Sequence, residues 1–350
     1  MSRIKKTLLK ENLIHNIKTI VAEAKDKEII WMIKSNAYGQ GVKEILPVLL
    51  ENKQYNFGLY DLEEVIKIDK IVTNCTLYIL DGLTKSEWTR INSNSIFRNN
   101  IVICLNKTSD IDKIININKN NIRFHAFFET GFNWYGIDDI DQFILTAIKN
   151  NLKLEGVCTH LADGANENSE ISIKQIANFN TIISIVKKYY PNIKTYLCNS
   201  DSYTKKTHSM HDLVRIGRAL YGGVDNLSKY KQVIKIEAEI LQVKYVKAGD
   251  FIGYGATFQA IKDIKIAIVC FGYNDGCDRR ISNNGFFAVK GKLCKVVGRV
   301  AMNITIIDVT GIEVREGDYA TYTDDIEGIR YCDIANRIGC LDYELMVRMD

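Results

Sequence analysis

The chain has 350 residues, of which 46% are hydrophobic and 25% charged, and it contains only two prolines. This length exceeds one small domain and fits a large α/β domain with a smaller companion in a globular protein. The net charge is only +4, and Lys and Arg are scattered among Asp and Glu, which argues against nucleic acid as a partner. We therefore expect a small-molecule ligand.

The N-terminal stretch "MSRIKKTLLKENLIHNI" has basic residues but lacks the continuous apolar segment of a signal peptide, and no uncharged run is long enough to span a bilayer. The nine cysteines stand singly, mostly within apolar runs, and none forms a C-x-x-C pair. This pattern predicts reduced, buried thiols rather than a disulfide framework or a zinc site. We expect a cytoplasmic protein without a metal site and without contact to a membrane.

Eight short apolar runs recur in the first two thirds of the chain and predict strands. They are residues 29–33, 57–61, 77–81, 101–105, 122–128, 154–160, 195–199 and 213–217. Between them lie segments whose apolar residues fall three and four apart, as in helices, for example 42–53, 137–151 and 172–190. Eight strands alternating with helices predict an α/β fold of the TIM (β/α)8 barrel type.

After Gly223 the pattern changes to alternating and β-branched runs, such as "VIKIEAEILQVKYV" and "ITIIDVT", punctuated by turn sequences. This texture predicts a separate all-β domain. We expect residues 1–225 to form the barrel and residues 226–350 to form the C-terminal β domain.

Polar residues that end the predicted strands are the candidates for chemistry, because barrel enzymes place their active sites at the C-terminal ends of the strands. Lys34 ends the first strand, Thr159–His160 the sixth, Asn199–Ser200 the seventh and Arg215–Gly217 the eighth. These ends meet on one rim, which thus collects an amine, an imidazole, an amide, a hydroxyl and a guanidinium.

The loops after strands seven and eight of a barrel often bind phosphate, and Ser200 and Gly217 fit that role. A lysine on the same rim suggests pyridoxal 5'-phosphate, because only an amine forms a Schiff base and this cofactor carries its own phosphate.

Seven motifs then point to a family. They are "IKSNAYGQG", "CTHLADGAN", "CNSDSY", "VRIGRALYGG", "GYGATFQA", "GYNDGCDRR" and "VVGRVAMN". Their order and contexts resemble those of alanine racemases, which are fold-type III pyridoxal-phosphate enzymes. The resemblance extends from about residue 7 to about residue 344.

The resemblance implies roles for individual residues. Lys34 matches the lysine that holds the cofactor and acts as one catalytic base, and Tyr254 matches the second base, which the family takes from the partner subunit. Arg215 matches the arginine that faces the pyridine nitrogen. Because an arginine keeps its proton, that nitrogen stays unprotonated, which favours reprotonation at Cα.

The resemblance also implies which residues surround the cofactor and the substrate. Those of the cofactor are Tyr38, His160, Asn199, Ser200 and Gly217. Those of the substrate are Met302, Trp134 and Tyr273.

Each residue taken alone also has a structural explanation. Lys34 can be a lysine at a strand end that reaches for solvent, and His160 a core histidine satisfied by a neighbour. Arg215 can pair with a carboxylate, Tyr254 can pack in a β domain, and Asn199–Ser200 can form an ordinary turn or helix cap. Only their combination in the order of the family favours the catalytic interpretation.

The sequence departs from the family near the substrate. Trp134 stands where the family has an arginine that contacts the cofactor's phenolic oxygen and the substrate carboxylate, and Phe127 stands where it has the lysine that holds this arginine. Asn303 replaces the usual aspartate. The chain ends at "YELMVRMD", before the family's terminal segment, so we expect its C-terminal active-site tyrosine to have no counterpart.

We therefore predict an isomerase: a homodimeric alanine racemase that uses pyridoxal phosphate, with Lys34 and Tyr254 as its two bases, in D-alanine biosynthesis for peptidoglycan. Two alternatives stay open. One is a racemase for a different amino acid with a remodelled pocket, and the other is a pyridoxal-phosphate-binding protein of the same fold with little activity.

Overall fold

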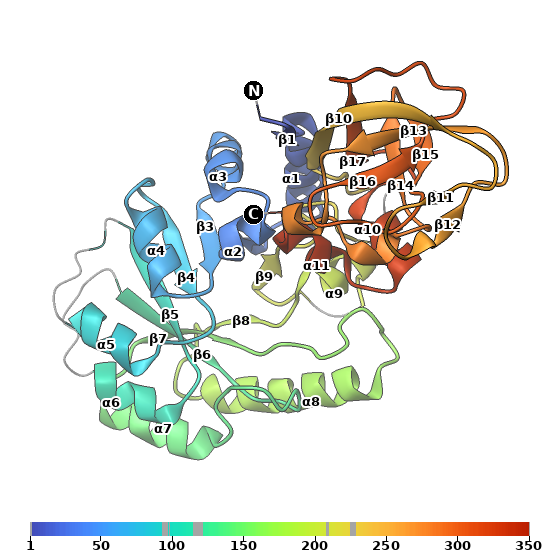
Figure 1. The fold of residues 1–350 in the computed structure, drawn as a ribbon. Helices are drawn as coiled ribbons and strands as arrows, with labels where there is room; N and C mark the ends of the chain where they lie inside the picture. The colour runs from blue at the N-terminus through green and yellow to red at the C-terminus, as the bar shows by residue number, and fades with distance from the viewer. Residues whose placement is uncertain are drawn as a thin grey trace. The chain divides into compact units, whose positions relative to one another are not determined.

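The computed structural model describes residues 2–92, 97, 99–114, 122–207, 210–224 and 229–349 (Figure 1). Its contacts divide the chain into two compact units. One comprises Lys18–Ala37 and Leu49–Ala219, here called the barrel unit, and the other comprises Met1–Ile17, Tyr38–Val48 and Leu220–Asp350, here called the β unit. Within the described ranges, no helix has both the length and the apolar character needed to cross a membrane.

Eight parallel strands form the sheet of the barrel unit. They are β2 (Glu28–Met32), β3 (Asn56–Leu59), β4 (Thr76–Ile79), β5 (Asn100–Leu105), β6 (Ile122–Phe127), β7 (Leu154–Cys158), β8 (Lys194–Tyr196) and β9 (Leu213–Ile216). Their order in the sheet is β8-β7-β6-β5-β4-β3-β2-β9, so all but β9 follow the chain. Each predicted strand is present, which confirms the predicted (β/α)8 barrel.

The ring closes between β8 and β9. The backbone N–H of Asp212 donates to Thr195 O at 2.9 Å, and that of Arg215 donates to Cys198 O at 3.1 Å. Closure leaves no open edge between these strands. It also brings the end of β9 beside the ends of β2 and β8.

Helices follow the strands and cover the outside of the ring (Figure 1). They include α4 (Leu62–Asp69), α5 (Lys85–Asn92), α6 (Ile111–Ile114), α7 (Ile140–Lys149), α8 (Glu170–Val186) and α9 (Ser200–Lys205). Several begin where a side chain caps the first turn: Asp61 accepts from Glu64 N, Asp139 from Gln142 N and Ser169 from Ser172 N. The predicted helices at 137–151 and 172–190 correspond to α7 and α8.

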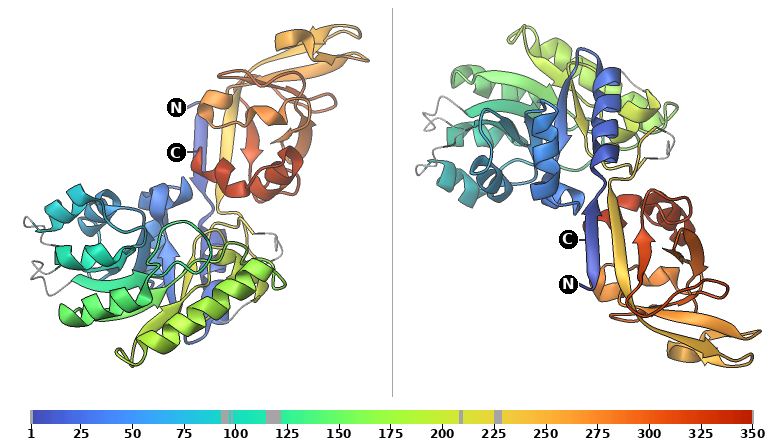
Figure 2. Two further views of the ribbon diagram at one scale, coloured as in Figure 1. Left: turned by 90° about the horizontal axis from the view of Figure 1, so that it is seen from below. Right: turned by 90° about the horizontal axis from the view of Figure 1, so that it is seen from above.

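The β unit is built on one antiparallel sheet, as the alternating pattern after Gly223 predicted. Its strands are β10 (Ile234–Val246), β13 (Ile264–Val269), β14 (Phe286–Val289), β15 (Lys292–Lys295), β16 (Thr305–Asp308) and β17 (Tyr319–Thr323), in the order β15-β14-β17-β10-β13-β16. A hairpin of β11 (Phe251–Ile252) and β12 (Phe258–Gln259) projects from it (Figure 2). Two helices, α10 (Tyr331–Ile338) and α11 (Asp342–Val347), complete this part of the chain.

The first strand of the chain was not predicted. β1 (Ile4–Leu8) pairs antiparallel with β10, from Ile4 opposite Ala238 to Leu8 opposite Ile234, and both views of Figure 2 show the two strands side by side. Only its two end residues are partly buried, so the short segment "IKKTL" lacks the apolar signal of the other strands. The N-terminal residues therefore complete the sheet of the β unit.

A buried asparagine connects α1 (Lys10–Ala24) to the chain that leads into β10. The Asn16 side chain is fully buried, and its Nδ2 donates to Leu220 O at 2.9 Å and to Lys231 O at 2.7 Å. Its Oδ1 accepts from Lys231 N at 2.8 Å. All three partners are backbone groups, of the fully buried Leu220 and the partly buried Lys231, so water can replace this side chain only in part.

We expect Asn16→Ala to lower the free energy of unfolding by about 3 kcal/mol, because three backbone groups would lose this partner. Denaturant unfolding followed by circular dichroism measures the change. Lys18→Ala, on the exposed face of the same helix, is the control and should change stability by less than about 0.5 kcal/mol. An Asn16→Ala protein as stable as the control would contradict this prediction.

Candidate active site

Lys34 stands where β2 ends, at the start of a left-handed turn, α2 (Lys34–Tyr38). Ser35, Asn36, Ala37 and Tyr38 all have φ between 50° and 57°. A left-handed conformation costs roughly 1–2 kcal/mol for each residue with a side chain, so the surroundings must hold this turn. Strain of this kind is concentrated at functional sites in proteins.

The carboxylate of Glu64, in the first turn of α4, provides part of that support. Its Oε1 accepts from Ser35 N at 2.6 Å and its Oε2 accepts from Tyr60 N at 2.8 Å. The turn after β2 and the turn after β3 are thereby held by one side chain. Lys34 is consequently presented at the carboxyl ends of the strands, as predicted.

The amine of Lys34 has a carboxylate as its charged neighbour. Its Nζ lies 3.7 Å from Asp81 Oδ2 and 5.8 Å from the centre of the Tyr60 ring, and about a third of the side chain is exposed. Asp81 follows β4, so the two charges come from adjacent positions on the barrel rim. Lys34 is therefore not a solvated lysine at a strand end.

Arg215, on β9, places a buried positive charge in the barrel unit. The residue is only 6% exposed, and its Nη2 lies 2.7 Å from Thr159 O, 3.1 Å from Leu197 O and 3.1 Å from His160 Nδ1. These bonds go to carbonyl and imidazole acceptors rather than to a carboxylate. They tie the ends of β7 and β8 to β9.

One donor of this guanidinium is unused. Arg215 Nε is buried and has no hydrogen-bond partner within the described part of the chain. A buried donor without an acceptor is costly, and such groups often mark the place of a missing ligand. An aromatic nitrogen with a free lone pair would satisfy it, so the site fits the ring nitrogen of pyridoxal phosphate.

His160 lies beside Arg215 and is neutral. Burial, followed by the positive charges of Arg215 and Lys34, lowers its pKa to about 3. Its Nδ1 accepts from Arg215, which assigns the ring proton to Nε2. The histidine therefore orients the guanidinium and adds no charge to the site.

Asn199 and Ser200 begin α9, and their side chains have different tasks. Asn199 is the helix cap: its Oδ1 accepts from Ser202 N at 3.1 Å. Ser200 Oγ accepts from Gly217 N at 3.0 Å and from Ala219 N at 3.3 Å. The Ser200 hydroxyl therefore links the start of α9 to the loop after β9, at the place on a barrel rim where phosphate is often bound.

The loop after β6 carries the predicted departures. The carboxylate of Glu129 accepts hydrogen bonds from the backbone N–H groups of Gly131, of Phe132 at 2.6 Å and of Trp134 at 3.1 Å. Trp134 is 66% exposed, and its ring centre lies 5.1 Å from that of Tyr135.

Further aromatic rings contact this loop, from Phe127 at the end of β6 and from His160 after β7. The rings of Phe127 and Tyr135 are 5.3 Å apart, those of Phe132 and Trp134 are also 5.3 Å apart, and Phe132 reaches His160 at 5.9 Å. The Tyr135 hydroxyl donates to Asp81 Oδ1. An aromatic cluster of Phe127, Phe132, Trp134 and Tyr135 therefore occupies the segment where a lysine and an arginine were expected from the resemblance.

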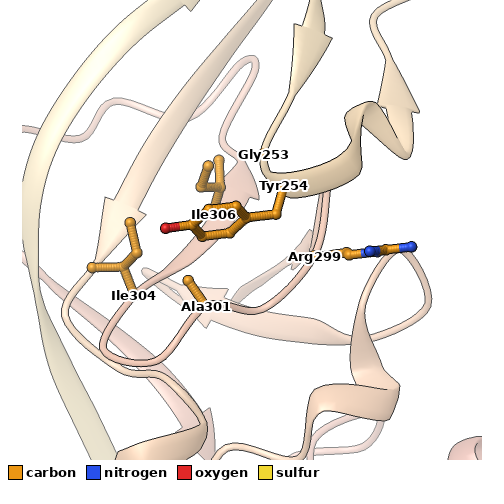
Figure 3. Close-up of a pocket in the computed structure, with 6 residues that line it drawn as sticks. All are labelled: Gly253, Tyr254, Arg299, Ala301, Ile304 and Ile306. Atoms are coloured by element: carbon orange, nitrogen blue, oxygen red, sulfur yellow. The ribbon is translucent and has the colours of Figure 1, made fainter.

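The other predicted residues belong to the β unit. Tyr254 is 72% exposed and lines a pocket of about 410 Å³ together with Gly253, Arg299, Ala301, Ile304 and Ile306. Figure 3 shows its ring lying over Ile306 with the hydroxyl toward Ile304, while Arg299 extends away.

Tyr273 and Met302 lie near this pocket. Tyr273 N donates to Ala301 O at 3.1 Å, and Asn274 N donates to Met302 O at 2.9 Å. Tyr273, Met302 and Asn303 are exposed. Tyr38 is also assigned to the β unit, where its ring is 5.4 Å from that of Tyr221.

The predicted site is thus divided between the two units. The barrel unit contains Lys34, Trp134, His160, Asn199, Ser200, Arg215 and Gly217, and the β unit contains Tyr38, Tyr254, Tyr273 and Met302. Asp81 and Tyr135 were missed. The rule that selected Lys34 applies equally to Asp81, because it ends the predicted strand 77–81. Within the described ranges no cluster of three or more metal-binding side chains occurs.

Comparison with known families gives two matches that cover most of the chain. Residues 10–225 match the family model for the alanine racemase N-terminal domain, and residues 233–350 match that for the alanine racemase C-terminal domain.

Individual relatives agree with these matches. An alanine racemase of Borreliella burgdorferi is 32% identical over 309 residues, which are 85% of this chain and 82% of that protein. One from Leptospira interrogans is 29% identical over 340 residues, covering 91% of this chain and 86% of the relative.

Solved structures have the same fold. The alanine racemase of Acinetobacter baumannii is 28% identical with a TM-score of 0.87, covering 100% of this chain and 98% of that one. The alanine racemase of Bartonella henselae, described with covalently bound pyridoxal phosphate, is 24% identical with the same TM-score and the same coverage.

We expect the loop that carries Trp134 to loosen in acid. Burial pushes the pKa of Glu129 upward, but the N–H groups of residues 131 to 134 outweigh it and hold this pKa below its usual range. Because the folded pKa is lowered, the stabilisation is complete above the unfolded value of about 4.3 and is lost as the pH falls through the folded value. The emission of Trp134, obtained as the difference between wild type and Trp134→Phe, reports the change.

A Glu129→Gln protein should show the loosened emission already at neutral pH, because an amide cannot accept all of these bonds. Far-UV circular dichroism serves as the control for a folded barrel. Wild-type emission in Glu129→Gln at neutral pH would contradict the prediction.

Proposed function

The chain belongs to the alanine racemase family, and we propose that it interconverts L- and D-alanine with pyridoxal phosphate as its cofactor. The observation that carries this proposal is the unused Nε of the buried Arg215, on the strand next to the one that presents Lys34. A guanidinium in this place has a donor for a ring nitrogen and cannot protonate it.

The cofactor supplies an electron sink that makes the Cα proton of a bound amino acid acidic. The residues of this chain bind it and move the proton. Lys34 Nζ would attach the cofactor, and Arg215 Nε would donate to its ring nitrogen. Ser200 and Gly217 would hold the phosphate, with Tyr38 as the further contact implied by the resemblance.

His160 and Asn199 act on this site through their neighbours. His160 accepts from Arg215 Nη2 and fixes the plane of the guanidinium. Asn199 caps α9 and so places Ser200 at its first turn. An arginine here would leave the ring nitrogen of the cofactor unprotonated, which would favour return of the proton to Cα.

Racemisation requires a base on each face of the substrate. Lys34 Nζ is one base, and the hydroxyl of Tyr254 is the other. Tyr254, Tyr273 and Met302 are exposed on the β unit, so we infer a homodimer in which Tyr254 of the partner subunit completes the site. In this division of labour, residues 1–225 hold the cofactor and residues 226–350 supply the second base and contacts to the substrate.

The proposed setting is the supply of D-alanine for peptidoglycan in the cytoplasm. All nine cysteines are free thiols, and seven of them are buried, as is usual for proteins of a reducing compartment.

A second candidate is a racemase for a different amino acid with a remodelled pocket. The aromatic cluster favours it, because Phe127 and Trp134 replace the charged pair that meets the substrate carboxylate in the family. Removing both charges together is tolerable for stability, whereas removing one would strand the other. The loss of a charge-assisted contact would still weaken carboxylate binding by about 1.5–3 kcal/mol.

We expect the loaded protein to exchange the Cα proton of L-alanine in heavy water, measured by proton NMR, and to form D-alanine. Lys34→Ala should abolish the exchange and the visible absorption of the bound cofactor. Tyr254→Phe should slow racemisation by about 100-fold or more, the contribution of one positioned base.

A panel of other L-amino acids separates the candidates. Faster exchange of a larger side chain than of alanine would favour the second candidate. Exchange of none, with the cofactor bound, would leave a pyridoxal-phosphate-binding protein and contradict both. A Tyr254→Phe protein that racemised alanine at the full rate in both directions would contradict the two-base assignment.

A further inference from the structure

A hydrogen bond holds the backbone of Asp81 on the barrel rim: Asn106 Nδ2 donates to Asp81 O at 3.0 Å. The next residue, Gly82, has φ of +76°, and a Cβ on it would lie 2.5 Å from Asn106 Nδ2. Glycine at position 82 therefore both allows this turn and leaves room for the amide that binds Asp81. The carboxylate of Asp81 is thus carried by a backbone that is bonded to the next loop of the barrel.

The two oxygens of Asp81 are used differently. Oδ1 accepts from the Tyr135 hydroxyl. Oδ2 is buried, has no hydrogen-bond partner within the described residues, and lies 3.7 Å from Lys34 Nζ. One oxygen is thus fixed by a neutral donor, while the other faces the amine of Lys34 with its acceptor capacity unused.

The groups around Asp81 define its charge. Burial raises its pKa, and the positive charges of Lys34 and Arg215 act in the opposite direction. His160 adds no charge, because its own pKa is lowered to about 3. Tyr135 donates without carrying a charge. Lys34 is consequently the cation beside this carboxylate. A change in the charge of either group therefore alters the electrostatic energy of the other.

Tyr135 is held by the residues that distinguish this chain from its family. Its ring is 5.3 Å from that of Phe127 and 5.1 Å from that of Trp134. These two residues replace the lysine and the arginine expected at their positions. The residues that replace the two charges therefore pack around the tyrosine whose hydroxyl donates to Asp81.

We propose that Asp81, fixed by Tyr135, is a positioning residue that holds the Lys34 side chain at the barrel rim and stabilises positive charge on its nitrogen. The proposal rests on the function proposed above, because it gives Asp81 a task only if Lys34 attaches the cofactor. In this arrangement the negative charge of Asp81 stabilises a positively charged nitrogen at Lys34. In the family, by the resemblance, an arginine at position 134 instead places a positive charge beside the cofactor's phenolic oxygen. Asp81 acts through Lys34 and is not itself a base.

The test is a pH titration of the visible band of the protein loaded with pyridoxal phosphate, which reports protonation at the Lys34 nitrogen. Asp81→Asn removes the carboxylate and keeps its shape. The midpoint of the spectral change should fall by about one pH unit or more, the usual effect of an opposite charge at this distance. If the wild-type band does not change up to about pH 11, we still expect the visible band of Asp81→Asn to change at a pH between about 6 and 11.

Tyr135→Phe tests whether the hydroxyl acts through the carboxylate, and it remains informative if Asp81→Asn fails to fold. Its midpoint should fall by less than that of Asp81→Asn, because the carboxylate stays but is no longer fixed. In the Asp81→Asn background the same change should have no further effect, since its partner is gone. Asp141→Asn, which removes an exposed carboxylate on α7 of the same unit, is the matched control and should titrate as wild type.

The outcomes separate this inference from the proposed function. A wild-type protein that forms no visible band, or that borohydride does not label at Lys34, would overturn the proposed function itself. A wild type that forms the band while Asp81→Asn keeps or raises its midpoint, or while neither band changes up to about pH 11, would overturn only the role of Asp81. A shift by Tyr135→Phe that persists without Asp81 would overturn the role of Tyr135.

Discussion

The barrel unit depends on one buried cation. The guanidinium of Arg215 bonds to Thr159 O, Leu197 O and His160, and so joins the ends of β7 and β8 to β9 where the ring closes. A buried charge is costly unless its donors are satisfied, yet Nε has no partner within the described residues. One donor of the guanidinium thus stays available for a ligand, and the neutral His160 accepts from another.

The fold could be predicted from the sequence because its strands are apolar on both faces and alternate with regular helices. Each of the eight barrel strands was identified by this signal, and the alternating runs after Gly223 identified the β unit. β1 was missed because "IKKTL" has only two apolar residues and becomes a strand by pairing with β10, which lies more than 220 residues away. Pairing between distant segments leaves little trace in a local pattern. The division of the chain at residue 225 stays a prediction.

The site was predictable only in part. Lys34, Arg215 and Ser200 follow apolar runs and could be selected from the rim of a barrel, but their roles rest on the resemblance and stay predictions. Asp81 carried the same signal and was overlooked, because its significance comes from Tyr135, which lies on another strand's loop. Likewise, Phe127 and Trp134 were read as lost charges, and the structure adds that they form contacts of their own. Contacts between loops cannot be obtained from one sequence.

The proposed function requires that the buried Arg215 faces the ring nitrogen of pyridoxal phosphate and leaves it unprotonated. Nitrogen-15 NMR of the protein loaded with cofactor labelled at the ring nitrogen tests this most directly, because the signal of a pyridine nitrogen changes strongly on protonation. We expect an unprotonated nitrogen throughout the pH range in which the protein is folded, since an arginine does not give up its proton. A protonated ring nitrogen at neutral pH would contradict the claim.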